Sequence, residues 1–340
     1  MSYLKIFSSV IFSLIFACGA LFAQNSSRQY AVLIGGLGGT EEHREKFRQY
    51  LYETRNALIE RCKFPEENIS VLAESPIEKY QFIEAISNAD NIRAKLSGLS
   101  NKLTTDDELY IFLFGHGSFD GKNAMLNIPR RDLKDSDYAA LLQSFHAGTI
   151  IFINTSSCSG PFINRLSAAN RIIITATKSG TERNETIFPQ FLIEALQNMA
   201  SDRDKNGMLS VLETFLYASE RTAGWYKEKN HLATEHPLLE DTGDKTAYRE
   251  EELSENGEGG LSSVTYLLRR APVPAVSIAG SSDSTYQRLI LELDKVNREI
   301  DLLKAKKGQY PEDEYFAKLE KYLLQLARIN EQIETYDQKQ

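Results

Sequence analysis

The sequence predicts an α/β fold in which helices cover both faces of a mostly parallel β-sheet. The first observation is a set of short apolar runs rich in β-branched and aromatic residues, at 30–34, 69–72, 108–114, 149–154 and 171–176. Such runs are typical of strands buried on both faces of a parallel sheet. The second observation is that segments with helical periodicity separate the runs. Strands that alternate with helices of this length predict a three-layer α/β/α sandwich.

Each predicted element follows from its local pattern. The first strand ends at a glycine-rich turn, 35–39, which matches neither the dinucleotide-binding pattern nor the P-loop pattern and is interpreted as a tight turn. The segments between strands carry apolar residues at helical spacing. We therefore expect helices at 41–62, 134–145, 188–199 and 210–229, with 77–99 mostly helical.

The first 23 residues are typical of a secretory signal peptide. They hold one charge, Lys5, an apolar run from 6 to 17 and a small-residue cleavage site before Gln24. Two alternatives stay open: a lipoprotein form, because 15–18 loosely resembles a lipoprotein box ending in Cys18, and an uncleaved anchor. We expect an exported protein, periplasmic, on the outer surface or secreted, without a membrane span once the signal is removed.

Charge and cysteine usage narrow the classes of partner. The formal net charge is −8 and the chain has no basic run, which argues against nucleic acid and anionic membrane surfaces as partners. Cleavage of the signal leaves Cys62 and Cys158. We expect them at opposite edges of the sheet, and a disulfide requires Cα atoms within roughly 7 Å. Two free thiols are therefore predicted.

Two consecutive predicted strands are each followed by a chemically reactive side chain. The strand at 108–114 leads directly into Gly115-His116-Gly117, and the strand at 149–154 is followed by Cys158. A helical crossover makes these strands parallel and often adjacent, so both residues emerge at the same edge of the sheet. A thiol and an imidazole placed in this way can form a nucleophile–base pair.

This combination resembles the caspase-like cysteine peptidases, and within them the bacterial relatives of the legumains. The resemblance runs from about residue 30 to residue 247. It implies Cys158 as the nucleophile, His116 as the general acid/base, and the backbone N–H groups of Gly117 and Cys158 as the oxyanion hole. The caspase pattern Gln-Ala-Cys-x-Gly is absent, which leaves the substrate preference undefined. His43 and Arg44 follow the glycine turn at the same edge and are candidates for lining a specificity pocket; the alternative is a solvated first helical turn.

A second motif lies at 202–213 and fits the twelve-residue EF-hand calcium loop. Oxygen-bearing side chains or glycine occupy each diagnostic position, so we expect a structural Ca²⁺. The expected ligands are Asp202, Asp204, Asn206, the Met208 carbonyl, Ser210 and Glu213. The alternative is a metal-free turn rich in Asp and Asn. The acidic segment 231–260 is interpreted as a solvated loop or a processing segment. The alternative is a weak second cation site around Glu240-Asp241 and Asp244.

The C-terminal part changes period. Residues 271–285 have the prolines, glycine and serines of a linker. Beyond them, apolar residues recur at alternating three- and four-residue steps in two segments on either side of Gly308 and Pro311. This spacing predicts an antiparallel helical hairpin over 286–340. It could form a homo-oligomer or dock a partner through 286–336, or serve as an internal stabilising hairpin.

The expected organisation is therefore a signal peptide at 1–23, a peptidase domain at 24–270, a linker at 271–285 and the hairpin. The favoured function is an exported cysteine endopeptidase that cleaves peptides or proteins through a thioacyl-enzyme. The alternative is a catalytically inactive, calcium-binding interaction protein built on the same scaffold.

Overall fold

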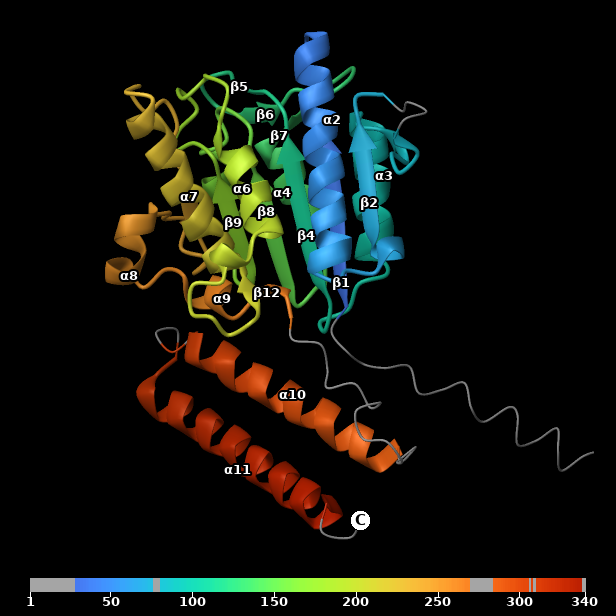
Figure 1. Ribbon diagram of the computed structural model, residues 1–340, viewed down its shortest axis with the longest axis vertical. Coiled ribbons are helices and arrows are strands. Elements are labelled where there is room, and N and C mark those ends of the chain that lie inside the picture. Colours follow the sequence, from blue (N-terminus) through green and yellow to red (C-terminus); the bar gives the residue numbers. More distant parts are fainter. Residues whose placement is uncertain (1–27, 76–79, 270–283, 306, 308–309, 338–340) are drawn as a thin grey trace, which may run out of the picture.

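The computed structural model describes residues 28–75, 80–269, 284–305, 307 and 310–337, and Figure 1 shows their arrangement. The predicted signal peptide and nearly all of the predicted linker lie outside these residues. Within the described part of the chain, no helix is both long and apolar enough to cross a bilayer. The mixed α/β architecture with a mostly parallel sheet is confirmed.

The central sheet has seven strands in the order β11-β9-β8-β4-β1-β2-β3. Six of them run parallel, and β11 is an antiparallel edge strand paired with β9. Their bounds in chain order are β1 Gln29–Gly35, β2 Ile69–Ala73, β3 Ala85–Ile86, β4 Glu108–Phe114, β8 Thr149–Asn154, β9 Arg171–Thr175 and β11 Leu238–Glu240. The apolar runs therefore predict the five longest strands closely, because each run is buried on both faces.

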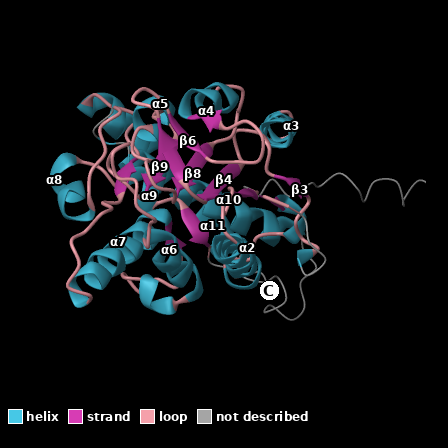
Figure 2. Cartoon of the chain, turned by 90° about the horizontal axis from the view of Figure 1, so that it is seen from above, coloured by secondary structure: helices cyan, strands magenta, loops and turns pink. Residues whose placement is uncertain are grey.

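Helices cover both faces of the sheet, as the end view in Figure 2 shows. One face carries α2 (Glu41–Asn56), α6 (Phe188–Gln197) and α7 (Val211–Glu228), which share one apolar cluster with the sheet. The other carries α3 (Ala89–Ser100), α4 (Asp135–Leu142) and α5 (Phe162–Leu166), which share a second cluster. Alternate residues of each strand enter alternate clusters, since side chains of a strand point to opposite faces.

Two local predictions differ from the structure. The expected helix over 41–62 ends as α2 at Asn56 and continues as a π-helical turn, Ala57–Arg61. The expectation of a mostly helical 77–99 is wrong for its first half within the described residues. Residues 85–86 form β3, because the backbone there extends the sheet beyond β2, and α3 begins only at Ala89, where the Asn88 side chain accepts a hydrogen bond from Asn91 N.

Smaller elements not predicted from the sequence complete the α/β part of the chain. A three-stranded antiparallel sheet follows His116, formed by β5 (Gly117–Phe119), β6 (Ala124–Leu126) and β7 (Leu133–Lys134). Short helices α8 (Leu253–Asn256) and α9 (Gly260–Ser263) follow β11, and β10 (Leu209–Ser210) pairs with β12 (Tyr266–Leu268).

The C-terminal segment forms two long helices, α10 (Ser284–Ala305) and α11 (Glu312–Asp337), which lie side by side below the sheet in Figure 1. They run antiparallel: the ring of Tyr286, near the start of α10, lies 5.1 Å from the ring of Tyr336, near the end of α11. Val296, Ile300 and Ile329 are buried between them. Leu302 packs against the core cluster of the α2 face, so the helix pair contacts the α/β part of the chain.

Candidate active site

His116 and Cys158 emerge from neighbouring strands at one edge of the sheet. Strand β4 pairs in parallel with β8 over their whole lengths, and His116 and Cys158 follow the C-terminal ends of these strands. The residues next to them are joined by hydrogen bonds. Gly117 N donates to Ser157 Oγ at 3.1 Å, and Ser157 Oγ lies 3.2 Å from Gly117 O. The two loops are thus held against each other.

The His116 imidazole lies against the first helix. Its ring is edge-on to the rings of His43, at 4.8 Å, and Phe47, at 5.1 Å, both on α2. Burial, followed by the neighbouring His43, lowers the pKa of His116 below its ordinary value of 6.5, although Glu185 acts in the opposite sense. The imidazole is therefore neutral near pH 7 and able to accept a proton.

The Cys158 thiol is covered in this form of the protein. Residue 158 is 1% exposed and has a left-handed backbone, with φ of 57°. Burial raises the pKa of the Cys158 thiol above its ordinary value of 9.0, with Arg183 acting weakly in the opposite sense. Cys62 is also a free, buried thiol, as predicted, and burial raises its pKa to about 12.

The loop that joins β9 to α6, residues 176–187, lies over Cys158 and is called the covering loop below. Its Glu182 carbonyl accepts a hydrogen bond from Cys158 N at 2.8 Å. The Glu182 carboxylate is held in turn by Lys178 N at 2.9 Å and by His236 Nδ1 at 2.5 Å. The sequence analysis did not single out this loop; the available signal was that it follows a buried strand ending at the same edge of the sheet.

A second attachment of the covering loop reaches the helix that supports His116. Glu185 lies 2.6 Å from Lys46 Nζ and 3.4 Å from His43 Nε2. His43 also contacts the His116 ring and therefore lies at the edge where it was expected. Arg44 instead pairs with Glu74, at 3.2 Å.

Both backbone N–H groups predicted to hold an oxyanion have internal partners. Gly117 N donates to the Ser157 hydroxyl, and Cys158 N donates to the carbonyl of Glu182. A substrate carbonyl can reach these donors only after the Ser157 side chain rotates and the covering loop withdraws. The structure therefore describes a resting arrangement of the site.

The segment 202–213 forms a compact loop between α6 and α7. Carboxylate oxygens of Asp202, Asp204 and Glu213 lie within 4.8 Å of one another, a spacing that a common cation could bridge. Asp202 accepts hydrogen bonds from Asn206 N and from Gly207 N, and Gly207 has a positive φ of 79°. The turn thus has the conformation that a glycine at the sixth loop position allows.

The remaining expected ligands lie around the same loop. The Glu213 carboxylate accepts hydrogen bonds from Ser210 N and Arg203 N, both at 2.9 Å, and closes the loop from its far end. The Asn206 side chain bonds to Met208 N at 2.7 Å. Strand β10, which contains Ser210, pairs with β12, so this loop is tied to the end of the peptidase part.

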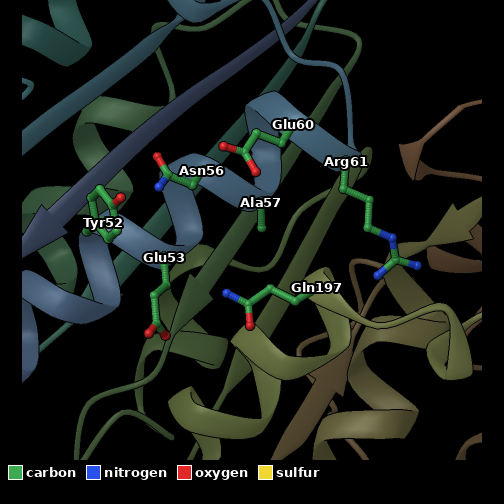
Figure 3. Close-up of a pocket in the computed structure, with 7 residues that line it drawn as sticks. All are labelled: Tyr52, Glu53, Asn56, Ala57, Glu60, Arg61 and Gln197. Atoms are coloured by element: carbon green, nitrogen blue, oxygen red, sulfur yellow. The ribbon is translucent and has the colours of Figure 1, made fainter.

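A separate surface pocket lies away from the dyad. Figure 3 shows it at the C-terminal end of α2, with Arg61 on the π-helical turn and Gln197 at the end of α6. Arg61 donates to the carbonyls of Ala195 and Leu196, which fixes the helix ends that frame the pocket. His43 and Phe47 lie in the opposite half of α2, so this pocket is not part of the candidate active site.

Comparison with known proteins identifies the central part of the chain. Residues 72–229 match the family model described as the Peptidase C13 family. The matched segment contains His116, Cys158, the covering loop and the loop at 202–213. No curated protein matches the chain.

Proposed function

From the membership of residues 72–229 in the Peptidase C13 family, the legumain family of caspase-like cysteine peptidases, we propose that this protein is an exported cysteine endopeptidase. The family implies a cysteine peptidase, and hence peptide or protein substrates. The single observation that supports the proposal for this chain is that the loops bearing His116 and Cys158 lie against each other. They follow parallel neighbouring strands, and the residues beside them are hydrogen-bonded to each other.

The proposed mechanism is acyl transfer to the Cys158 sulfur. The neutral His116 imidazole takes the thiol proton as sulfur forms a bond to the substrate carbonyl carbon. The carbonyl oxygen becomes an oxyanion, stabilised by the N–H groups of Gly117 and Cys158. His116 then gives its proton to the leaving amine as the C–N bond breaks. Water, deprotonated by His116, hydrolyses the thioacyl-enzyme and restores the thiol.

Opening of the site is part of this proposal. Cys158 N is bonded to Glu182 O in the resting arrangement, so substrate entry has to displace the covering loop. The loop is held by exposed or half-exposed polar groups, among them Lys46 and His236. Such contacts are weak in water, and a peptide that forms backbone hydrogen bonds at this edge can replace them.

We also propose a structural Ca²⁺ at 202–213, held by Asp202, Asp204, Asn206, the Met208 carbonyl, Ser210 and Glu213. The convergence of the three carboxylates supports it. The ion would neutralise their mutual repulsion and clamp α6 to α7. Chelation is then expected to lower the melting temperature of the wild type by more than that of an Asp202→Asn/Asp204→Asn variant. Equal melting temperatures with and without chelator in the wild type would exclude the site.

Profiling a peptide library with the purified mature protein tests the proposed activity. We expect cleavage that disappears in Cys158→Ala. An electrophilic peptide probe should label Cys158 in the wild type, and far more slowly in His116→Ala, because the imidazole accepts the thiol proton. Cleavage retained by Cys158→Ala would overturn the assignment.

The second candidate is a calcium-binding interaction protein on a catalytically inactive scaffold. Two observations favour it: the Cys158 thiol is buried with a raised pKa, and the exposed side of α11 carries Phe316, Leu323 and Leu324, each about half exposed. Such an apolar surface suits self-association or partner docking. Labelling of Cys158 that is as slow as that of Cys62 and unaffected by His116→Ala would favour this candidate.

A further inference from the structure

A second group of carboxylates gathers where β11 ends, outside the segment that matches the peptidase family. Glu240, Asp241 and Glu258 are buried, with 0%, 4% and 7% of their surfaces exposed, and Asp244 lies beside them at the surface. None of the four forms an ion pair with a lysine or arginine of the described residues. Buried carboxylates without a counter-charge are costly, and proteins normally pair them or use them to coordinate metals.

One buried oxygen of this group accepts no hydrogen bond from the described residues. The Oε1 atom of Glu240 accepts hydrogen bonds from Gly243 N and Asp244 N, whereas Oε2 is buried and has no such donor, although the Ser167 side chain lies near this carboxylate. A buried acceptor without a donor destabilises the folded protein, and a charged acceptor does so more strongly. The arrangement therefore leaves a ligand position open inside the group.

The other two carboxylates are held in place by backbone donors. The Glu258 carboxylate accepts hydrogen bonds from Asp241 N at 2.8 Å and from the Thr242 hydroxyl at 2.9 Å. The Asp241 carboxylate accepts hydrogen bonds from Gly259 N at 2.9 Å and from Ser262 N at 2.7 Å, which anchors the start of α9. The segments that contribute the carboxylates are therefore already cross-linked, and the oxygen positions are set without an ion.

The distances match those of a cation shell. One oxygen each of Glu240, Asp244 and Glu258 lies within 4.8 Å of the others. Two oxygens that bind the same Ca²⁺ at 2.3–2.6 Å can be at most about 5 Å apart. All three donors are hard oxygen ligands, without a nitrogen or sulfur that would select zinc.

We propose that Glu240, Asp244 and Glu258 bind a Ca²⁺ ion, separate from the predicted ion at 202–213. The ion joins the end of edge strand β11 to the segment that leads into α9. One carboxylate comes from the last residue of β11 and the other two come from irregular backbone, which suits the flexible coordination of Ca²⁺ better than the octahedral shell of Mg²⁺. Because β11 pairs with β9, which precedes the covering loop, the ion stabilises one flank of the peptidase part.

Calcium stoichiometry of the mature full-length protein tests this site. Equilibrium dialysis with radioactive Ca²⁺ should detect one bound ion that is retained in Asp202→Asn/Asp204→Asn. In Asp244→Asn, which loses a charged ligand, the affinity for this ion should fall at least about tenfold. Asp244 is exposed, so this variant should fold normally. Glu258→Gln is the second variant, and circular dichroism reports its folding. Glu251→Gln, an exposed neighbour outside the group, is the matched control for loss of one negative charge.

The outcomes separate cleanly. Weaker binding in Asp244→Asn, with Glu251→Gln unchanged, supports the site. Binding in Asp244→Asn that equals that of the Glu251→Gln control would overturn it, whether or not Glu258→Gln folds. Because dialysis measures the ion and not cleavage, an inactive protein or an empty loop at 202–213 would leave this result fully interpretable.

Discussion

Gly117 lies so close to the Cys158 loop that a single methyl group tests the geometry of the site. A Cβ atom built on Gly117 would lie 2.0 Å from Ser157 O and 2.8 Å from Ser156 Oγ, whereas real Cβ contacts stay above 3.0 Å. The backbone oxygen is not the flexible end of a side chain. In Gly117→Ala, the β5 backbone and the Cys158 loop therefore have to separate by about 1 Å.

This displacement sets the expected magnitude. A misplacement of about 1 Å between reacting groups can lower a rate about 100-fold, which corresponds to roughly 2.7 kcal/mol of transition-state stabilisation. The same movement breaks the pair of contacts between Gly117 and Ser157 and shifts one of the proposed oxyanion donors. We therefore expect kcat/KM of Gly117→Ala to fall by about two orders of magnitude.

The assay compares kcat/KM on the best substrate from the peptide library with the rate of Cys158 alkylation. The control is Gly98→Ala in α3, where a Cβ meets no atom within 4 Å and helix propensity favours alanine by at most about 1 kcal/mol. Urea unfolding of both variants shows whether the protein is folded at the assay temperature. If folded Gly117→Ala keeps kcat/KM within twofold of Gly98→Ala, the proposed contact between the two loops plays no part in catalysis.

Three further predictions concern pH and stability. Burial raises the pKa of Cys158 and lowers that of His116, so the alkylation rate of Cys158 should climb steadily between pH 6.5 and 9.0; a flat rate would indicate a thiolate–imidazolium pair instead. Burial raises the pKa of Glu235 from 4.5 to about 7, so the stability gained from its protonated form is fully present below pH 4.5 and is lost as the pH rises to 7. The free energy of unfolding in urea should fall by about 3 kcal/mol over this window relative to Glu235→Gln. Equal pH dependence of the two proteins would contradict this. Burial opposes ionisation of Asp107, but hydrogen bonds from Arg28 and Thr104 lower its pKa, so the protein loses stability as the pH falls through this lowered pKa. At pH 7, Asp107→Asn should lower the free energy of unfolding by about 2–3 kcal/mol. An unchanged urea midpoint would refute the pairing.

Local pattern was enough to locate the two strands that lead to His116 and Cys158. Residues 108–114 and 149–154 are apolar throughout or nearly so, and only a strand buried on both faces accommodates such runs. A helical crossover between them makes parallel pairing the expected result, and β4 and β8 are indeed neighbours. Local pattern also indicated the C-terminal helices. There α10 and α11 pack against each other through heptad residues such as Val296, Ile300 and Ile329.

The sequence by itself thus predicted the five longest strands, the edge at which His116 and Cys158 emerge, and the acidic residues of the loop at 202–213, because periodicity and turn chemistry are local properties. Only the tertiary structure decided that Glu182 covers Cys158, that Leu238–Glu240 forms an edge strand, and that Glu258 lies beside Glu240. These features depend on backbone donors and acceptors that find partners far away in the chain. Tertiary packing determines which of these groups meet, and the local sequence around each group does not specify its partner.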